Sequence, residues 1–173
     1  MGLQQELGFR FTPPNPIQHA LQRTASTRPG SWLFQRTLYR VDRPLHRWTR
    51  GKVTLPGLVT GLPVIMLTTT GAKSGLPRTM PVAGIPFGDD LVILGTNYAQ
   101  QHTPGWVFNL LKDPQATVAW RSTSVQVVAS RVASDRMDEV WQAAGRVYVG
   151  FPKYRERTSG SREVHAFRLG AAG

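Results

Sequence analysis

The residues best suited to chemistry lie in one loop, TTTGAKSGLPRTMP, at residues 68–81. The residues of this loop that could contact an anion are Thr69, Thr70, Gly71, Lys73, Ser74, Gly75 and Arg78. Backbone amides and hydroxyls can donate hydrogen bonds to an anion, and Lys73 and Arg78 add charge-assisted bonds. Glycines let the backbone approach a ligand closely. The composition favours an anion-binding cradle, and the alternative is a plain hairpin turn formed by Ser-Gly and Leu-Pro.

Side-chain catalysis has little support in the rest of the chain. Without any cysteine there is neither a thiolate nucleophile nor a cysteine-based metal site. The G-x-S-x-G elbow of α/β hydrolases and the G-x-x-x-x-G-K-[ST] phosphate loop are both absent. The four histidines lie far apart, without an i+3 or i+4 partner suited to a metal: His19, His46, His102 and His165. We therefore expect no metal, and any reaction would depend on a bound cofactor.

The overall charge is a second strong signal. Lys and Arg number 21 against 10 Asp and Glu, which gives a formal net charge of +11 and a pI near 11.2. Such an excess favours nucleic acid, an anionic membrane surface, or a ligand rich in phosphate or carboxylate. We do not expect nucleic acid, because the cations are not interleaved with aromatic residues as in a single-strand groove.

The chain length of 173 residues predicts one domain. No uncharged apolar run approaches the ~20 residues that a membrane-spanning helix needs. The N-terminal MGLQQELGFR lacks the apolar core of a secretory signal. We therefore expect a cytoplasmic protein.

Residues 53–173 predict a β domain. Apolar runs predict strands at residues 63–70, 78–87, 91–97, 115–121, 124–132 and 163–169. Helices are predicted at 105–113 and 135–148, the second with Ser134 as its N-cap. Most strands follow one another without a crossover helix, so the sheet should be antiparallel and close into a small barrel with peripheral helices.

The sequence of residues 1–52 indicates two further segments before the β domain. The composition of residues 1–30, rich in Pro, Gln, Thr and Ser, predicts a segment that is either weakly ordered or draped on the body. Residues 31–52 predict a basic amphipathic helix, with apolar residues on one face and arginines on the other. The apolar residues are Phe34, Leu38, Val41, Leu45 and Trp48, and the arginines are Arg36, Arg40, Arg43, Arg47 and Arg50. This helix could pack on the barrel as a lid, or bind peripherally to an anionic membrane at its inner face.

Three runs resemble the motifs of one family, the deazaflavin-dependent nitroreductases, which are coenzyme F420-dependent oxidoreductases of actinobacteria. The loop at 68–81 is similar to that family's T-x-G-R-K-[ST]-G-x-x-R-x-x-P. The run T-P-G-W-V-F-N-L-L-K-D-P at 103–114 resembles N-P-x-W-x-x-N-L-x-x-N-P, and F-P-K-Y-R-E-R at 151–157 resembles Y-P-x-Y-x-x-Y. The three runs keep the family's order within a match that covers about residues 55–169.

The resemblance implies a split β-barrel of the flavin-reductase and pyridoxamine-phosphate-oxidase-like type, which binds coenzyme F420. The tail of this deazaflavin carries a phosphodiester and glutamates. By motif, Lys73 and Arg78 would hold the tail, with Thr70, Gly71 and Ser74 beside them. The residues implied to line or flank the rest of the cofactor are Pro81, Ala83, Thr96, Asn97 and Trp106.

The same resemblance implies where the acceptor binds. Tyr154 matches the middle tyrosine of the substrate-side motif, and Tyr154 or Thr96 would hydrogen-bond or protonate the developing oxyanion. Packing in the pocket wall is the alternative for Tyr154, and packing of a helix on the barrel is the alternative for Trp106.

Departures from the family pattern concern charge and substrate. Ala72 stands where the family has arginine and Asn97 where it has lysine, so two expected cations are missing. The tail would then be held with fewer charges, or by arginines from elsewhere in this basic chain. Phe151 and Arg157 replace the outer two tyrosines, so the family's substrate preference is not carried over.

The predicted function is transfer of hydride from reduced deazaflavin to a quinone-like or other conjugated small molecule. The protein would act as a monomer or dimer. Two alternatives remain open at this point. One is an FMN-dependent reductase in the same barrel, and the other is a non-enzymatic module that binds a hydrophobic ligand or acts through its basic surface.

Overall fold

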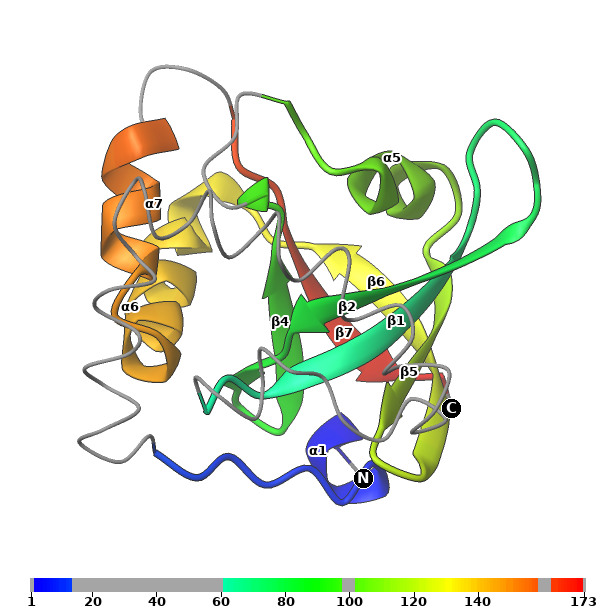
Figure 1. The fold of residues 1–173 in the computed structure, drawn as a ribbon, viewed down its shortest axis with the longest axis horizontal. Coiled ribbons are helices and arrows are strands. Elements are labelled where there is room, and N and C mark those ends of the chain that lie inside the picture. The colour runs from blue at the N-terminus through cyan, green and yellow to red at the C-terminus, as the bar shows by residue number, and fades with distance from the viewer. Residues whose placement is uncertain (1, 14–60, 98–101, 159–162, 173) are drawn as a thin grey trace.

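The computed structural model describes residues 2–13, 61–97, 102–158 and 163–172 (Figure 1). Within them, seven strands form one antiparallel sheet in the order β2-β1-β5-β6-β7-β4-β3. The strands are β1 (Val64–Thr70), β2 (Pro77–Ala83), β3 (Ile85–Phe87), β4 (Asp90–Leu94), β5 (Gln115–Trp120), β6 (Thr123–Arg131) and β7 (Ala166–Ala171). The predicted fold, mainly antiparallel β with peripheral helices, is confirmed.

The sheet curls on itself because its two edge strands are consecutive in the chain. β2 and β3 lie at opposite ends of the strand order, yet Gly84 alone separates them. The Gly84 amide donates to the carbonyl of Pro63 at 2.9 Å, and a Cβ on Gly84 would lie 3.1 Å from a methyl group of Ile65. The glycine therefore lets the chain pass close to β1. The single strand predicted at 78–87 is consequently two strands, and the sheet forms a split barrel.

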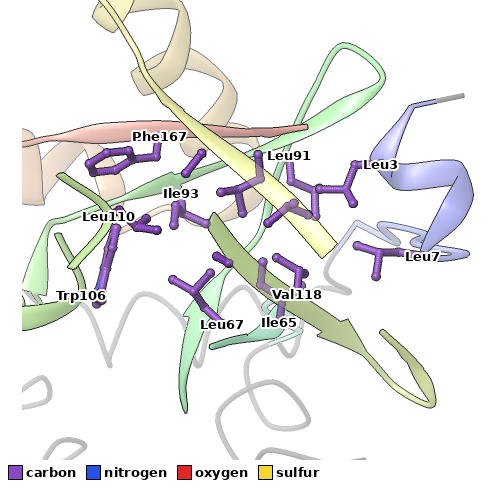
Figure 2. Packing of buried hydrophobic residues seen from close by; sticks show 14 of the residues in the cluster. Leu3, Leu7, Ile65, Leu67, Leu91, Ile93, Trp106, Leu110, Val118 and Phe167 are labelled. Atoms are coloured by element: carbon purple, nitrogen blue, oxygen red, sulfur yellow. The ribbon is translucent and has the colours of Figure 1, made fainter. Parts of the chain in front are cut away.

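A hydrophobic cluster fills the interior of the barrel (Figure 2). Its fully buried strand residues include Ile65, Leu67, Leu91, Ile93, Val118, Phe167 and Leu169. The helix α5 (Gly105–Lys112) closes one side of the cluster with Trp106 and Leu110. The ring of Trp106 packs edge-on against Phe167, with ring centroids 6.0 Å apart. Since burial of one such side chain contributes about 1.5–3 kcal/mol, this cluster is a main source of stability.

A second cluster lies between the sheet and two helices, α6 (Met137–Val147) and α7 (Phe151–Thr158). β4 contributes to both clusters by strict alternation. Leu91 and Ile93 point into the barrel, whereas Val92 and Leu94 pack toward the helices. This explains why the sequence of β4 reads as a strand buried on both faces.

The first described residues pack into the barrel as well. α1 (Leu3–Glu6) is one helical turn, and the side chains of Leu3 and Leu7 are fully buried in the interior cluster. The Leu3 amide donates to a carboxylate oxygen of Asp90 at 3.2 Å, and Gln4 donates to the carbonyl of Gly88 at 2.8 Å. Residues 2–13 thus lie against the body of the domain, which is the second of the two alternatives expected for residues 1–30. A single turn has too few residues to show a helical period, so α1 itself was not predicted.

The helices after β6 also differ in detail from the prediction. A 3₁₀ turn at Ser134–Arg136 precedes α6, and the N-cap position of α6 is Arg136, without a side-chain capping bond. The predicted cap at Ser134 is therefore wrong. α7 was not predicted as a helix, because half of its sequence FPKYRERT is charged and Pro152 stands near its start.

Several predictions lie outside the described residues. They are the remainder of the N-terminal segment 1–30, the basic amphipathic helix at 31–52, and the start of the β domain at 53–60. Among the helices that the structure does describe, none is long and apolar enough to cross a membrane.

Candidate functional site

The loop at residues 71–76 is the turn of the hairpin formed by β1 and β2. Thr70 and Pro77 are Cα partners at the last rung of the hairpin. The Gly71 amide then donates to the carbonyl of Leu76 at 2.9 Å, and the Gly75 amide donates to the carbonyl of Gly71 at 2.8 Å. Gly75 has a φ of +67°, which favours glycine. The loop is therefore closed by its own backbone.

Gly71 is the position in this loop where a side chain would not fit. A Cβ there would lie 2.6 Å from the hydroxyl oxygen of Ser74 and 3.1 Å from the carbonyl of Leu76. Ser74 also accepts a hydrogen bond from the Leu76 amide at 3.3 Å. Because its own hydroxyl hydrogen stays available, Ser74 can still donate to a ligand.

Helix α5 holds the loop in place through Asn109. The side-chain amide of Asn109 donates to the hydroxyl of Thr69 at 2.9 Å, and its carbonyl oxygen accepts from the Ala72 amide at 2.8 Å. Asn109 is 8 % exposed and Thr69 is 2 % exposed, so the bond between them is buried, whereas the bond from the Ala72 amide is partly buried. An interior hydrogen-bonded amide of this kind rigidifies the segment that it contacts.

Three cations surround the loop. Lys73 lies at its tip, Arg78 lies on β2 beside it, and Lys112 of α5 donates from its ammonium group to the carbonyl of Ala72 at 2.7 Å. All three side chains are exposed, and within the described residues none of them forms an ion pair. The predicted cradle residues Thr70, Gly71, Lys73, Ser74 and Arg78 are therefore brought together in one positively charged loop.

The hairpin register separates the predicted tail-binding residues from the predicted ring-lining residues. Arg78 is the Cα partner of Thr69, whose side chain faces α5. Pro81 and Ala83 are the partners of Met66 and Val64, and so lie on the opposite face of β2. β2 is an edge strand, so a ligand could extend from one face to the other around this edge.

Tyr154 lies in the second cluster with Tyr148 and Phe151. The ring centroid of Tyr154 is 5.9 Å from that of Tyr148 and 6.1 Å from that of Phe151. Ala83 packs against the same cluster, so the structure brings Ala83 and Tyr154 to the same side of the sheet. Tyr148 was not predicted as a site residue. The sequence feature that could have indicated the packing of Tyr148 is the nearby Gly150, where a Cβ would lie 2.2 Å from the Tyr148 ring.

The remaining predicted residues are Thr96, Asn97 and Trp106. Thr96 is buried just beyond the end of β4. Asn97 adopts a φ of 45°, and its side-chain amide donates to the carbonyl of His102 at 3.1 Å. Asn97 therefore has a structural role in this turn. Trp106 packs in the barrel interior rather than beside Tyr154, which agrees with the packing interpretation.

His165 is a further polar residue near the end of β4. Its carbonyl accepts from the Gly95 amide at 2.9 Å, so His165 lies next to Thr96. Its Nδ1 is buried and has no hydrogen-bond partner among the described residues. In the sequence His165 is one of four histidines that lie far apart, and no role in the site was predicted for it.

A groove on another part of the surface holds none of the predicted residues. It measures about 450 Å³ and is bordered by β3 and α6, with Phe87, Arg136, Arg146 and Arg168 among its lining residues. Two of its arginines are neutralised: Arg136 pairs with Glu139 at 2.7 Å and Arg168 pairs with Asp90 at 2.8 Å. The hydrogen bond from Arg136 lowers the pKa of the Glu139 carboxyl. The β1–β2 loop is the better candidate site, because its cations form no ion pair within the described residues.

The described residues thus form a split barrel with a glycine-containing loop on its β1–β2 turn, beside which the exposed cations Lys73, Arg78 and Lys112 lie. Residues 38–165 match the family described as F420H(2)-dependent quinone reductase. The chain is 28 % identical over 127 residues to the F420H(2)-dependent quinone reductase of Mycobacterium tuberculosis strain H37Rv, an alignment that covers 70 % of this chain and 83 % of that protein. The protein of strain CDC 1551 gives the same figures.

Solved structures agree in fold. The F420-H2 dependent reductase FDR-A superposes with a TM-score of 0.55 at 23 % identity, covering 62 % of this chain and 93 % of that one. A chain described as a domain-swapped dimer superposes with a TM-score of 0.58 at 22 % identity, covering 82 % and 98 %. At such identities these likenesses support the split-barrel fold.

The protein belongs to the F420H(2)-dependent quinone reductase family. The predicted family resemblance, the enzyme class of F420H2-dependent reductase and coenzyme F420 as the cofactor are thereby confirmed. The roles of individual site residues stay predictions.

The loop fits the tail of this coenzyme. Gly71 leaves the space that a Cβ would fill, and the exposed cations Lys73, Arg78 and Lys112 have no carboxylate partner within the described residues. Asn109 was missed as a positioning residue, although it is the asparagine of the run at 103–114.

Proposed function

We propose that the protein uses reduced coenzyme F420 to reduce a quinone or a related conjugated carbonyl compound. The observation that carries the proposal is the loop at 71–76, where Asn109 holds the backbone and the exposed cations form no ion pair among the described residues. Family membership supports the coenzyme. The names of the two mycobacterial relatives support a quinone as the acceptor.

In this proposal the cradle binds the phosphate and carboxylate groups of the coenzyme tail. Lys73 and Arg78 supply charge-assisted hydrogen bonds, and the hydroxyls of Thr70 and Ser74 donate beside them. Gly71 lets the tail lie against the backbone. Because the loop is closed before ligand binds, less conformational entropy is lost on binding.

The deazaflavin ring would lie across the β2 edge, against Pro81 and Ala83. The register supports this proposal, because it puts these two residues on the face opposite Arg78. Thr96 and Asn97 lie at the end of β4, and Trp106 supports the barrel wall from inside.

Reduced coenzyme F420 supplies a hydride, and a proton must also reach the acceptor oxygens so that a quinone becomes a hydroquinone. We assign the hydrogen bond to the developing oxyanion to Tyr154 or Thr96. Tyr154 is 5 % exposed and lies among aromatic rings, where such a bond is stronger than in water.

The proposal is tested with Arg78→Ala. The exposed side chain contributes little to folding, so the thermal midpoint should stay close to that of the wild type. Loss of one charge-assisted bond should weaken binding of coenzyme F420 by about tenfold, as measured by equilibrium fluorescence titration. Unchanged affinity would contradict the assigned role. A panel of benzoquinones and naphthoquinones, mixed with the reduced coenzyme and the wild-type protein, tests the acceptor.

Two further assignments are kept as proposals. Residues 31–52 would contact an anionic membrane peripherally and so place a cytoplasmic enzyme close to lipid-soluble acceptors. Flotation with anionic vesicles at low salt tests this contact, and absence of binding would eliminate it. The oligomeric state is monomer or dimer, which sedimentation equilibrium would decide.

A further inference from the structure

We propose that Lys112 of α5 is a third cation of the cradle and binds the anionic tail of the coenzyme directly. This inference rests on the proposed function, because it takes coenzyme F420 as the ligand. Lys112 lies 40 residues away from the loop in sequence, yet its ammonium group donates to the carbonyl of Ala72 at 2.7 Å. The charge is thus supplied from another element.

The contact with Ala72 positions the ammonium group and leaves it able to bind. A lysine ammonium carries three donors, and the bond to Ala72 uses one of them. Two donors remain for a phosphate or carboxylate oxygen. A lysine side chain that is already held in place loses less rotamer entropy on binding than a freely rotating one.

Helix α5 acts on the loop through two residues one turn apart. Asn109 and Lys112 are spaced i, i+3, so they lie side by side on the helix surface. Asn109 accepts from the amide of Ala72, and Lys112 donates to the carbonyl of the same residue. One face of the helix therefore fixes the loop backbone through Asn109 and supplies a positive charge through Lys112. Both contacts are with Ala72, whose own side chain is uncharged.

Within the part of the chain that the structure describes, no carboxylate forms an ion pair with Lys73, Arg78 or Lys112. The described ion pairs are Arg131–Glu163, Arg136–Glu139, Arg155–Asp138 and Arg168–Asp90, and none of them involves the loop. The neighbouring carboxylate of Asp113 accepts from the Gln115 amide at 3.0 Å instead. Lys73, Arg78 and Lys112 thus form an uncompensated positive cluster, which suits a ligand that carries several anionic groups.

The test compares Lys112→Ala, Lys112→Arg and a control, Arg146→Ala, by equilibrium fluorescence titration. Arg146 is an exposed cation on α6, so its removal changes the net charge equally but at a distance from the loop. Two probes are used: coenzyme F420, and a deazaflavin chromophore that lacks the phosphate and glutamyl groups. Lys112→Met, which keeps the apolar stem, replaces Lys112→Ala if the latter does not fold.

We expect Lys112→Ala to bind coenzyme F420 about 5- to 20-fold more weakly, with Lys112→Arg and Arg146→Ala within about threefold of the wild type. The tail-free chromophore should bind all four proteins equally. Equal affinity of Lys112→Ala and Arg146→Ala for the coenzyme would overturn the inference. An equal loss for both probes would also overturn it, since this indicates a displaced loop. A wild-type protein that binds neither probe would refute the proposed function itself.

Discussion

Replacement of Asn109 by leucine is expected to destabilise the fold and to weaken coenzyme binding together. The substitution leaves the buried hydroxyl of Thr69 and the amide of Ala72 without their partner. An unsatisfied buried polar group costs about 1–3 kcal/mol, so two of them cost about 2–6 kcal/mol. Burial of the leucine side chain offsets roughly 1–2 kcal/mol of this.

The central net loss is about 2.5 kcal/mol, from about 4 kcal/mol lost and about 1.5 kcal/mol regained, and it is measurable as a thermal shift. For a chain of this length, 1 kcal/mol corresponds to about 2–4 °C, so the midpoint should fall by roughly 5–10 °C. Differential scanning calorimetry gives the shift, and fluorescence titration gives the affinity for coenzyme F420. A midpoint within about 2 °C of the wild type, with unchanged affinity, would refute the role of Asn109 in holding the loop.

Asn109→Asp is the matched control, because it is nearly isosteric. A carboxylate can still accept from the Ala72 amide, and the Thr69 hydroxyl can donate to it. Stability should therefore fall less than with leucine. The new negative charge lies beside Lys112 and opposes the anionic tail, so the affinity should fall even where stability is kept. This pair of variants separates the shape of the loop from its charge.

Three other variants test separate parts of the account. Gly71→Ala brings a Cβ to 2.6 Å from the Ser74 hydroxyl oxygen and 3.1 Å from the Leu76 carbonyl, so the Ser74 side chain must move and the Cβ fills space proposed for the tail; coenzyme affinity should fall about tenfold in a fluorescence titration. Tyr154→Phe should lower kcat by roughly 10–100-fold with unchanged coenzyme affinity, if its hydroxyl stabilises the oxyanion, as steady-state kinetics would show. Equal kcat would leave Tyr154 with a packing role. Arg136 lowers the pKa of Glu139, so their pair contributes stability above the usual pKa of a glutamate, and this contribution is lost as pH falls through the lowered value. Glu139→Gln should therefore melt slightly below the wild type at neutral pH, and the difference should be small because salt and water screen this exposed pair. In acid the two proteins should melt at the same temperature, because Glu139 is then protonated and the pair is lost.

Several features of the fold were predictable because they are local. The apolar runs at β1 and β4 and the hairpin of β5 and β6 are visible as patterns in the sequence. Others depend on tertiary contacts. The single turn of α1 is held by Asp90 and by burial of Leu3, and the break between β2 and β3 occurs where Gly84 passes over Ile65. Neither contact leaves a periodic signal in the chain.

The residues of the candidate site also fall into two groups: those that the sequence predicts and those that only the tertiary structure brings to the loop. The cradle residues were predictable because Lys73 and Arg78 lie close in sequence within one glycine-rich turn. Asn109 and Lys112 reach the same loop from another element, and no spacing rule connects residues so far apart. The sequence raises the question of what replaces the cation absent at Ala72, and it leaves two answers open: fewer charges, or arginines from elsewhere in the chain. In the structure the ammonium group of Lys112 lies 2.7 Å from the Ala72 carbonyl.

The central claim is that this split barrel binds coenzyme F420 and uses it to reduce quinones. Equilibrium titration of the purified protein with coenzyme F420 and with FMN, followed by addition of a naphthoquinone to the complex with the reduced coenzyme, tests it most directly. We expect saturable binding of coenzyme F420, much weaker binding of FMN, and oxidation of the reduced coenzyme only when the quinone and the protein are both present. Tight binding of FMN without binding of coenzyme F420 would contradict the account.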